Sequence, residues 1–323
     1  MTEPTTDTVF VDAHARLHFG VLDLRGSLGR WFGGIGAAAP APMVRLSARR
    51  ADRLTAVGPD AERALDFARR FLQHHRLDAG AEIAIQQALP PHTGLGSGTQ
   101  LGLAVGRALA ELHSIPTDPV SLALAVGRAK RSAIGTWLFS GGGLVVEGGR
   151  ARDGDGCGPL IARIELPAEW QCVVAVPGGQ AGLSGSAESH AFSTLPQPPQ
   201  QEVEHVAHLV LMALLPAAAD GDLVAFGRAL TEIQQINGRW FAAVQGDTFA
   251  PGIPRTLIEQ MLGAGAAGAG QSSWGPAVYG IVDGPSAAER LAAALGDTLG
   301  AGGAVYHGPF PTHGARVWRN AGG

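Results

Sequence analysis

The stretch that decides the fold is a glycine-rich segment, Pro90-Pro91-His92-Thr93-Gly94-Leu95-Gly96-Ser97-Gly98-Thr99. It follows a strand-like run at 82–87 and precedes a helix-like run at 100–112 that is rich in alanine and leucine. Alternating glycines let a backbone approach a ligand closely, because no Cβ stands in the way. Amides at a helix N-terminus attract anions. The pattern predicts a phosphate-binding loop, and the alternative is a structural turn ahead of an ordinary helix.

Two common phosphate motifs are excluded by this sequence. A Walker A loop ends in Gly-Lys-Ser/Thr, and no lysine lies between positions 90 and 112. A dinucleotide-binding fingerprint needs a third glycine where Thr99 stands, and the acidic residue expected on a following strand is missing. A phosphate-binding loop in this position would therefore be of another class, and the structural turn stays the alternative.

Composition limits the classes of protein that fit. The chain has 323 residues, 46% of them hydrophobic, which is enough for two domains. A net charge of −4 argues against a nucleic-acid partner. The two cysteines, Cys157 and Cys172, have no metal-site spacing. The N-terminus is polar, and the apolar run at 209–219 is shorter than the roughly 20 residues of a membrane span. We expect a cytoplasmic protein without a membrane partner.

The order of elements predicts an α+β protein. Strands are expected at 9–24 and 44–57 with a glycine-, alanine- and proline-rich loop at 26–42 between them, followed by an amphipathic helix at 60–76. The segment at 177–199 is expected to be a lid or substrate loop. A polar, glycine-rich stretch at 148–158 suggests two domains, an N-terminal one at 1–155 with the phosphate loop and a C-terminal α+β domain at 156–323.

Five separated motifs together resemble one family. They are Ala15-Arg16-Leu17-His18-Phe19-Gly20 with Leu22-Asp23-Leu24, Gly29-Arg30 and Gly33 to Gly36; Pro90-Pro91-His92 with Gly94 to Gln100; Gly127-Arg128 with Ser132-Ala133-Ile134-Gly135-Thr136, Phe139 and Gly141-Gly142-Gly143; Gly182-Leu183-Ser184-Gly185 with Glu188; and Gly270-Gln271-Ser272-Ser273-Trp274-Gly275-Pro276 with Tyr279. In this order they resemble the β-ribofuranosylaminobenzene 5′-phosphate synthases, a non-kinase branch of the GHMP kinase superfamily.

The resemblance implies a two-domain GHMP kinase-like fold and a decarboxylating synthase. The substrates would be phosphoribosyl pyrophosphate and 4-aminobenzoate or 4-hydroxybenzoate, in the biosynthesis of methanopterin-type cofactors. Mg²⁺ is expected with the pyrophosphate, and a homodimer is expected. The alternatives are an ATP-dependent GHMP kinase and a non-catalytic binding protein. The kinases carry a catalytic aspartate downstream of the loop, whereas residues 132–143 contain no acid.

The same motifs supply the candidate site residues. Arg16 and Arg30 are candidates for bidentate contacts with phosphate or carboxylate, and His18 and His92 for donors or proton shuttles. Asp23 could hold Mg²⁺ or balance positive charge. Each of these five residues also has a purely structural interpretation, as an ion-pair partner, a packed histidine or a turn-stabilising acid.

Two further groups of candidates would bind the substrates. The amides of residues 94–99 and the hydroxyls of Ser97 and Thr99 would hold a phosphate, and Trp274 would stack on the aromatic acceptor or else pack in the core. The predicted binding residues are Arg30, Gly94, Leu95, Gly96, Ser97, Gly98, Thr99, Gln100, Ser132, Gln271, Ser272, Ser273 and Trp274.

Overall fold

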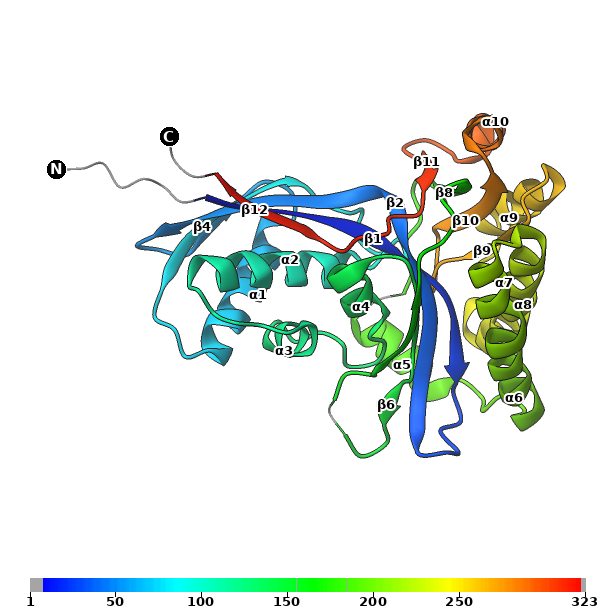
Figure 1. Ribbon diagram of the computed structural model, residues 1–323, viewed down its shortest axis with the longest axis horizontal. Coiled ribbons are helices and arrows are strands. Elements are labelled where there is room, and N and C mark those ends of the chain that lie inside the picture. The colour runs from blue at the N-terminus through cyan, green and yellow to red at the C-terminus, as the bar shows by residue number, and fades with distance from the viewer. Residues whose placement is uncertain (1–7, 155, 184, 321–323) are drawn as a thin grey trace.

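The computed structural model describes residues 8–154, 156–183 and 185–320, and it contains two sheets covered by helices (Figure 1). The first sheet has the strand order β12-β1-β2-β4-β3, with β5 and β6 paired to β2 and β7 paired to β5. Its strands are β1 (Thr8–Asp23), β2 (Arg30–Ala51), β3 (Thr55–Val57), β4 (Gly80–Gln87), β5 (Leu144–Glu147), β6 (Arg150–Ala151), β7 (Leu160–Ile164) and β12 (Arg316–Asn320).

Strand β1 shows the alternation expected of a half-buried strand. Its inward side chains, from Val9 through Ala13 and Leu17 to Phe19, are fully buried at every second position. The expected loop at 26–42 is wrong from residue 30 onward, because β2 is one continuous strand over 30–51. Small residues are needed there for close packing: a Cβ on Gly36 would lie 2.5 Å from the side chain of Ile134.

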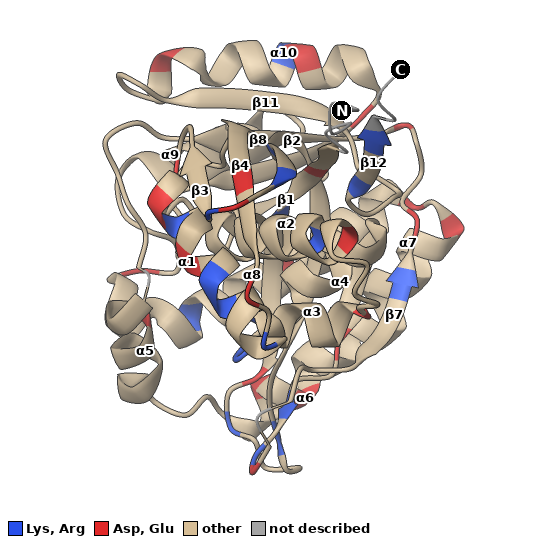
Figure 2. Ribbon diagram, turned by 90° about the vertical axis from the view of Figure 1, so that its left-hand side faces the viewer, with Lys and Arg blue, Asp and Glu red and all other residues tan. Residues whose placement is uncertain are grey.

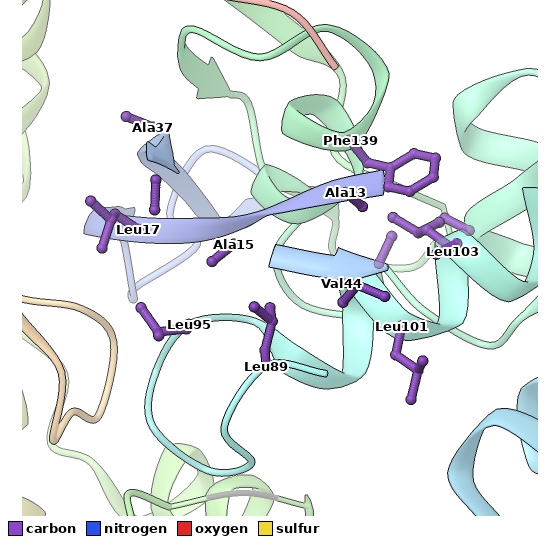
Figure 3. Packing of buried hydrophobic residues seen from close by; sticks show 14 of the residues in the cluster. Ala13, Ala15, Leu17, Ala37, Val44, Leu89, Leu95, Leu101, Leu103 and Phe139 are labelled. Atoms are coloured by element: carbon purple, nitrogen blue, oxygen red, sulfur yellow. The ribbon is translucent and has the colours of Figure 1, made fainter. Parts of the chain in front are cut away.

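Helices cover one face of the first sheet. They are α1 (Ala61–His74), α2 (Ser97–Leu112), α3 (Pro119–Ala125) and α4 (Ile134–Gly141). The helix predicted at 60–76 is confirmed, and its buried face contains Phe67 and Phe71. Leu101 and Leu103 of α2 join Ala13 and Val44 in the central hydrophobic cluster (Figure 3). The glycine-rich loop is thereby fixed to a helix that is anchored in the core.

The second sheet has the order β11-β8-β10-β9. Its strands are β8 (Trp170–Val176), β9 (Gly268–Gln271), β10 (Val278–Asp283) and β11 (Ala304–Pro309). The helices around it are α6 (Gln200–Leu209), the π-helical η1 (Val210–Leu214), α7 (Leu215–Asp220), α8 (Leu223–Gln245), α9 (Ile253–Gly263), α10 (Pro285–Leu295) and the short η2 (Gly296–Thr298). Within the expected loop at 177–199, residues 185–194 form helix α5 (Gly185–Thr194).

The sheets do not divide the chain at the expected boundary between residues 155 and 156. Both β7 and β12 come after that point, yet β7 pairs with β5 and β12 pairs with β1 in the first sheet. Residue 155 itself lies outside the described residues, as does Ser184 of the fourth motif. The first sheet is therefore assembled from both ends of the chain.

The continuous helical stretch α6-η1-α7 is long and apolar enough to cross a membrane by length and composition. In the fold it packs on α8 and buries Val206 and Leu214 completely. Only 33% of its most apolar window is buried, and Leu211 and Met212 stay exposed. Acidic and basic positions are interspersed over the surrounding elements (Figure 2).

Candidate active site

A cleft of about 850 Å³ lies between the two sheets' helices. Its walls come from the glycine-rich loop and the start of α2, from α1, from the connection between α3 and α4, and from α5, α8 and the β9–β10 connection. Of the sequence-predicted residues, those that line it are Arg16, His18, His92, Gly94, Gly96, Ser97, Gly98, Thr99, Ser132, Gln271, Ser273 and Trp274. Four of the five motifs thus contribute predicted site residues to one cavity. The fourth motif contributes Gly185 and Glu188, which were not among the predicted site residues.

Two glycines of the loop are required by its geometry. Gly94 and Gly96 have φ values of +81° and +75°, in the left-handed region that favours glycine. A Cβ on Gly94 would lie 2.2 Å from the carbonyl oxygen of Ser272, and one on Gly96 would lie 2.7 Å from Cγ of Arg16. The loop can pass this close to its neighbours only because positions 94 and 96 carry no side chain.

The amides of the loop are free of protein acceptors. Within the described chain, no hydrogen bond is made by the backbone N–H groups of residues 94–98, which precede or open the 16-residue helix α2. The expectation for Thr99 is wrong in this respect, because its amide and that of Gln100 both donate to the Gly96 carbonyl at 3.0 Å. The remaining amides and the positive end of the helix have the chemistry that suits an anion.

Two arginines adjoin this loop without an acidic partner in the described structure. Nη1 of Arg16 donates to the Gly94 carbonyl at 2.6 Å, and the Arg128 guanidinium donates to Oγ1 of Thr99 at 3.0 and 3.2 Å. Burial lowers the pKa of Arg16 to about 10, and burial, followed by the nearby Arg63, lowers the pKa of Arg128. Both remain cations at neutral pH. In the described chain neither forms an ion pair with a carboxylate, but the charge of Glu188 acts on both and raises their pKa values.

The two predicted histidines have different surroundings. His18 is 9% exposed, and burial followed by the charge of Arg16 lowers its pKa to about 3, so it is neutral at pH 7. Its Nε2 lies 3.5 Å from Oγ of Ser132. His92 is exposed at the cleft, and its carbonyl accepts the amide of Gly182 at 2.6 Å. His18 is therefore a neutral hydrogen-bonding group in this state, whereas His92 ties the loop to the segment before α5.

The β9–β10 connection forms the opposite wall. The Ser272 hydroxyl is buried, donates to the Gly94 carbonyl at 2.7 Å and accepts the amide of His18 at 3.0 Å. Nε2 of Gln271 donates to the Ser273 carbonyl at 3.0 Å. Trp274 is 7% exposed and reaches the cleft beside other aromatic rings. Ser272 thus acts as a clamp between loops, while Gln271, Ser273 and Trp274 line the cavity.

Several predicted residues are not brought to the cleft. Asp23 accepts the amides of Arg25 and Gly26 at 2.5 and 3.0 Å, which is the turn-stabilising alternative. Arg30 donates to the carbonyls of Gly148 and Gly149. Two further predicted residues are 1% exposed: Leu95 packs in the core, and Gln100 donates to the Gly135 carbonyl. They shape the surroundings of the loop and lie away from the cavity.

Sequence reasoning missed several residues of the cleft. The basic ones are Arg63, Arg70, Arg128, Lys130, Arg131 and Arg150, and the aromatic ones are Phe32, Phe67, Phe192 and Phe241. The pairs Gly127-Arg128 and Lys130-Arg131 were a usable signal, since they lie just before the third motif's Ser132. The phenylalanines carry no local signal because they come from distant segments.

Two family models match the chain, the GHMP kinases N terminal domain at residues 61–138 and the GHMP kinases C terminal domain at 214–302. Solved structures agree on the fold. Homoserine kinase from Cytophaga hutchinsonii has a TM-score of 0.69 at 18% identity, covering 98% of this chain and 99% of its own. Phosphomevalonate kinase from Streptococcus pneumoniae has a TM-score of 0.68 at 14% identity, covering 94% and 100%. The fold is that of the GHMP kinase superfamily, as predicted.

Curated relatives identify the branch within this superfamily. A beta-ribofuranosylphenol 5′-phosphate synthase from Methanothermobacter thermautotrophicus is 33% identical, with 93% of this chain and 96% of the relative covered. One from Archaeoglobus fulgidus is 34% identical, with 83% and 86% covered. The chain belongs to the β-ribofuranosylphenol 5′-phosphate synthase family of enzymes, which confirms the predicted resemblance.

Proposed function

We propose that this enzyme condenses phosphoribosyl pyrophosphate with a para-substituted benzoate, 4-hydroxybenzoate or 4-aminobenzoate, and releases pyrophosphate and carbon dioxide. The observation that carries the proposal is the pairing of free loop amides at residues 94–98 with the guanidinium groups of Arg16 and Arg128, neither of which forms an ion pair in the described chain. A donor with two phosphate-bearing ends fits such a site. The curated relatives are named for a β-ribofuranosylphenol 5′-phosphate, which is the product that this reaction would give from 4-hydroxybenzoate.

The proposed reaction balances without an oxidant or reductant. The bond between the anomeric carbon and pyrophosphate breaks, and pyrophosphate leaves with the electron pair. The ring carbon that bears the carboxylate then bonds to the anomeric carbon, and loss of carbon dioxide returns an electron pair to the ring. The loop amides and the two arginines would stabilise the charge on the phosphates, and the cleft would hold both reactants in line.

The histidine beside this site fits a positioning role. His18 is neutral because burial and the charge of Arg16 disfavour its protonated form. A phosphate dianion bound next to it would oppose both effects and raise its pKa. We therefore assign His18 to hydrogen bonding with the donor, with Ser132 as its neighbour in the free enzyme.

Mg²⁺ would enter this cleft with the donor. The carboxylates that line it in the described chain are Asp66 and Glu188, and each forms an ion pair with an arginine, Arg70 and Arg131 respectively. Among the described residues there is also no group of three or more histidine, cysteine or acidic residues that could hold a metal. The protein thus offers no cage of its own, and Mg²⁺ fits better as a complex with the substrate's pyrophosphate and water.

A kinase reaction is less favoured by the same cleft. A hydroxyl nucleophile needs a free catalytic base. Residues 132–143 supply no acid, and the two cleft carboxylates named above are already paired with arginines. The similar kinases of known structure share the fold at less than 25% identity, which does not extend to their reactions.

The experiment is an assay with phosphoribosyl pyrophosphate, MgCl₂ and a carboxyl-labelled benzoate. We expect labelled carbon dioxide and pyrophosphate in equal amounts, and no reaction when the donor is replaced by ATP. ATP-dependent phosphorylation without release of carbon dioxide would select the kinase, and donor binding without turnover would select a binding protein. A homodimer and a cytoplasmic location stay predictions, which mass measurement in solution and cell fractionation would check.

A further inference from the structure

One end of the cleft is built from aromatic side chains that the phosphate chemistry leaves unused. Phe32 of β2, Phe192 of α5, Phe241 of α8 and Trp274 of the β9–β10 connection all line it, and they are called the aromatic wall below. The rings of Phe192, Phe241 and Trp274 contact one another edge to face, with centroid distances of 4.8, 5.5 and 5.9 Å. Phe32 meets Phe192 in the same way at 5.6 Å.

The backbone is strained at two positions in or next to the aromatic wall. Phe32 adopts φ +71°, a left-handed conformation that bulky residues rarely take. Ser273, next to Trp274, has φ +56°. Strain at two of the segments that present these rings is typical of a functional site. The rings are also only partly covered: Phe32, Phe192 and Phe241 keep surface toward the cavity.

Cations lie at the edge of the wall. The guanidinium carbon of Arg131 is 5.3 Å from the ring centre of Phe192, and that of Arg150 is 5.7 Å from the ring centre of Phe32. In this structure Arg131 binds the carboxylate of Glu188, and it also donates to Oγ of Ser189 at 2.9 Å. Arg131 is thus placed to hold a carboxylate directly beside an aromatic face.

The connection between α3 and α4 joins the two ends of the cleft. Arg128 in this connection donates to Thr99 of the phosphate loop, and three residues later Arg131 lies over Phe192. In the proposed reaction the ring carbon that carries the carboxylate must face the donor's anomeric carbon. Arg131 would hold a carboxylate beside Phe192, three residues along the chain from the arginine that contacts the phosphate loop.

We propose that the aromatic wall is the acceptor subsite for a planar aromatic acid, and that Arg131 anchors the acid's carboxylate after releasing Glu188. This inference rests on the proposed function, and it adds which residues select the acceptor. Phe241 and Phe192 favour an aromatic over a saturated ring, and Arg131 favours an acid over a phenol. Glu188 competes with the ligand for Arg131.

The test measures binding of three probes to the full chain by calorimetry, with magnesium pyrophosphate present: 4-hydroxybenzoate, cyclohexanecarboxylate and phenol. We expect wild type to bind 4-hydroxybenzoate roughly tenfold more tightly than either analogue, since edge-to-face and charge-assisted contacts differ by about that much. Phe241→Leu should remove the preference over cyclohexanecarboxylate, and Arg131→Gln the preference over phenol. Glu188→Gln should tighten binding of 4-hydroxybenzoate several-fold.

Phe10→Leu is the matched control, because Phe10 stacks on Trp318 in the first sheet and does not line the cleft. It should leave all three affinities unchanged, and the melting temperature of each variant reports its folding. Wild type that fails to bind 4-hydroxybenzoate, or an Arg131→Gln variant that weakens all three probes equally, would overturn the proposal. A folded Phe241→Leu that keeps the wild-type preference would do so as well.

Failure of this inference and failure of the proposed function give different results. If wild type releases carbon dioxide while Phe241→Leu and Arg131→Gln keep its KM for the acceptor, the subsite is wrong and the reaction stands. If the variants change probe binding as expected but no carbon dioxide forms, the subsite stands and the reaction is wrong.

Discussion

The two ends of the cleft use opposite means to bind a ligand. The phosphate loop works through its backbone, because glycines remove side chains and leave the amides of residues 94–98 free. The aromatic wall works through side chains, with four rings delivered by four separate segments. The first device suits any phosphate. The second is where a change of acceptor chemistry can be built without altering the fold.

The largest effect should come from removing charge at the phosphate end. Arg16→Met should reduce kcat/KM about a hundred- to a thousand-fold, as loss of a preorganised charge-stabilising donor does. Affinity for 4-hydroxybenzoate should stay within about twofold, since Arg16 contacts the loop and not the rings. Steady-state kinetics and calorimetry measure both, with Arg45→Met on the exposed side of β2 as the control. If Arg16→Met weakened the binding of 4-hydroxybenzoate as much as it lowered kcat/KM, the phosphate loop and the aromatic wall would not act independently.

The next largest effect should come from a side chain added to the backbone of the phosphate loop. Gly94→Ala should lower the free energy of unfolding by about 2 to 3 kcal/mol, because it combines left-handed strain with a contact to the Ser272 carbonyl. Gly29 has nearly the same φ, +82°, but a Cβ there would meet nothing within 4 Å. Gly29→Ala should therefore cost only about 1 kcal/mol. Urea unfolding of the two variants separates strain from contact, and equal losses would contradict the tight approach of the loops.

The buried acid Glu147 should make the stability of the protein depend on pH. Glu147 is fully buried and accepts the amides of Ala133 and Gly149, and burial raises its pKa to about 7. Between about pH 4.5 and 7 the folded state holds a proton that the unfolded state has lost, so wild type loses stability as pH rises.

Glu147→Gln removes that dependence. Its unfolding free energy relative to wild type should therefore increase by about 2 kcal/mol from pH 5 to pH 8. Urea unfolding at the two pH values measures the change, with Glu82→Gln at an exposed ion pair as the control. A constant difference would mean that Glu147 is ionised across this range.

The smallest effect should come from a single hydroxyl of the loop. Ser97→Ala leaves every amide in place and removes at most one hydrogen bond to the phosphate. We expect KM for phosphoribosyl pyrophosphate to rise about three- to fivefold, which corresponds to roughly 1 kcal/mol. Ser47→Ala on β2 is the control, because the Ser47 hydroxyl accepts from Gln86 and does not line the cleft. A loss as large as that of Arg16→Met would mean that side chains and not amides hold the phosphate.

The sequence predicts the phosphate end better than the aromatic end, for a physical reason. Glycine spacing, the helix after it and the buried face of α1 are local patterns, and all are present in the structure. Trp274 could be predicted only because it stands within a motif. Phe32 and Phe241 are more than 200 residues apart, so nothing in the sequence pattern links them.

The structure differs from the sequence prediction in two other places, because the residue types there occur in more than one structural role. The glycines and alanines at 30–42 have the composition of a loop, but they form strand β2 because α4 packs closely on it. Asp23 and Arg30 are polar residues within a matching motif, yet their side chains complete backbone hydrogen bonds in and beside the β1–β2 hairpin. Motif membership alone does not reveal which way such a side chain faces.

The pairing of β12 with β1 has a consequence for biosynthesis. Residues 8–12 meet residues 316–320, so one edge of β1 stays open while about 300 intervening residues leave the ribosome. An open strand edge is a template for wrong pairing with other chains. We expect the nascent protein to depend on chaperones until its last strand emerges, and truncated forms lacking that strand to aggregate during expression.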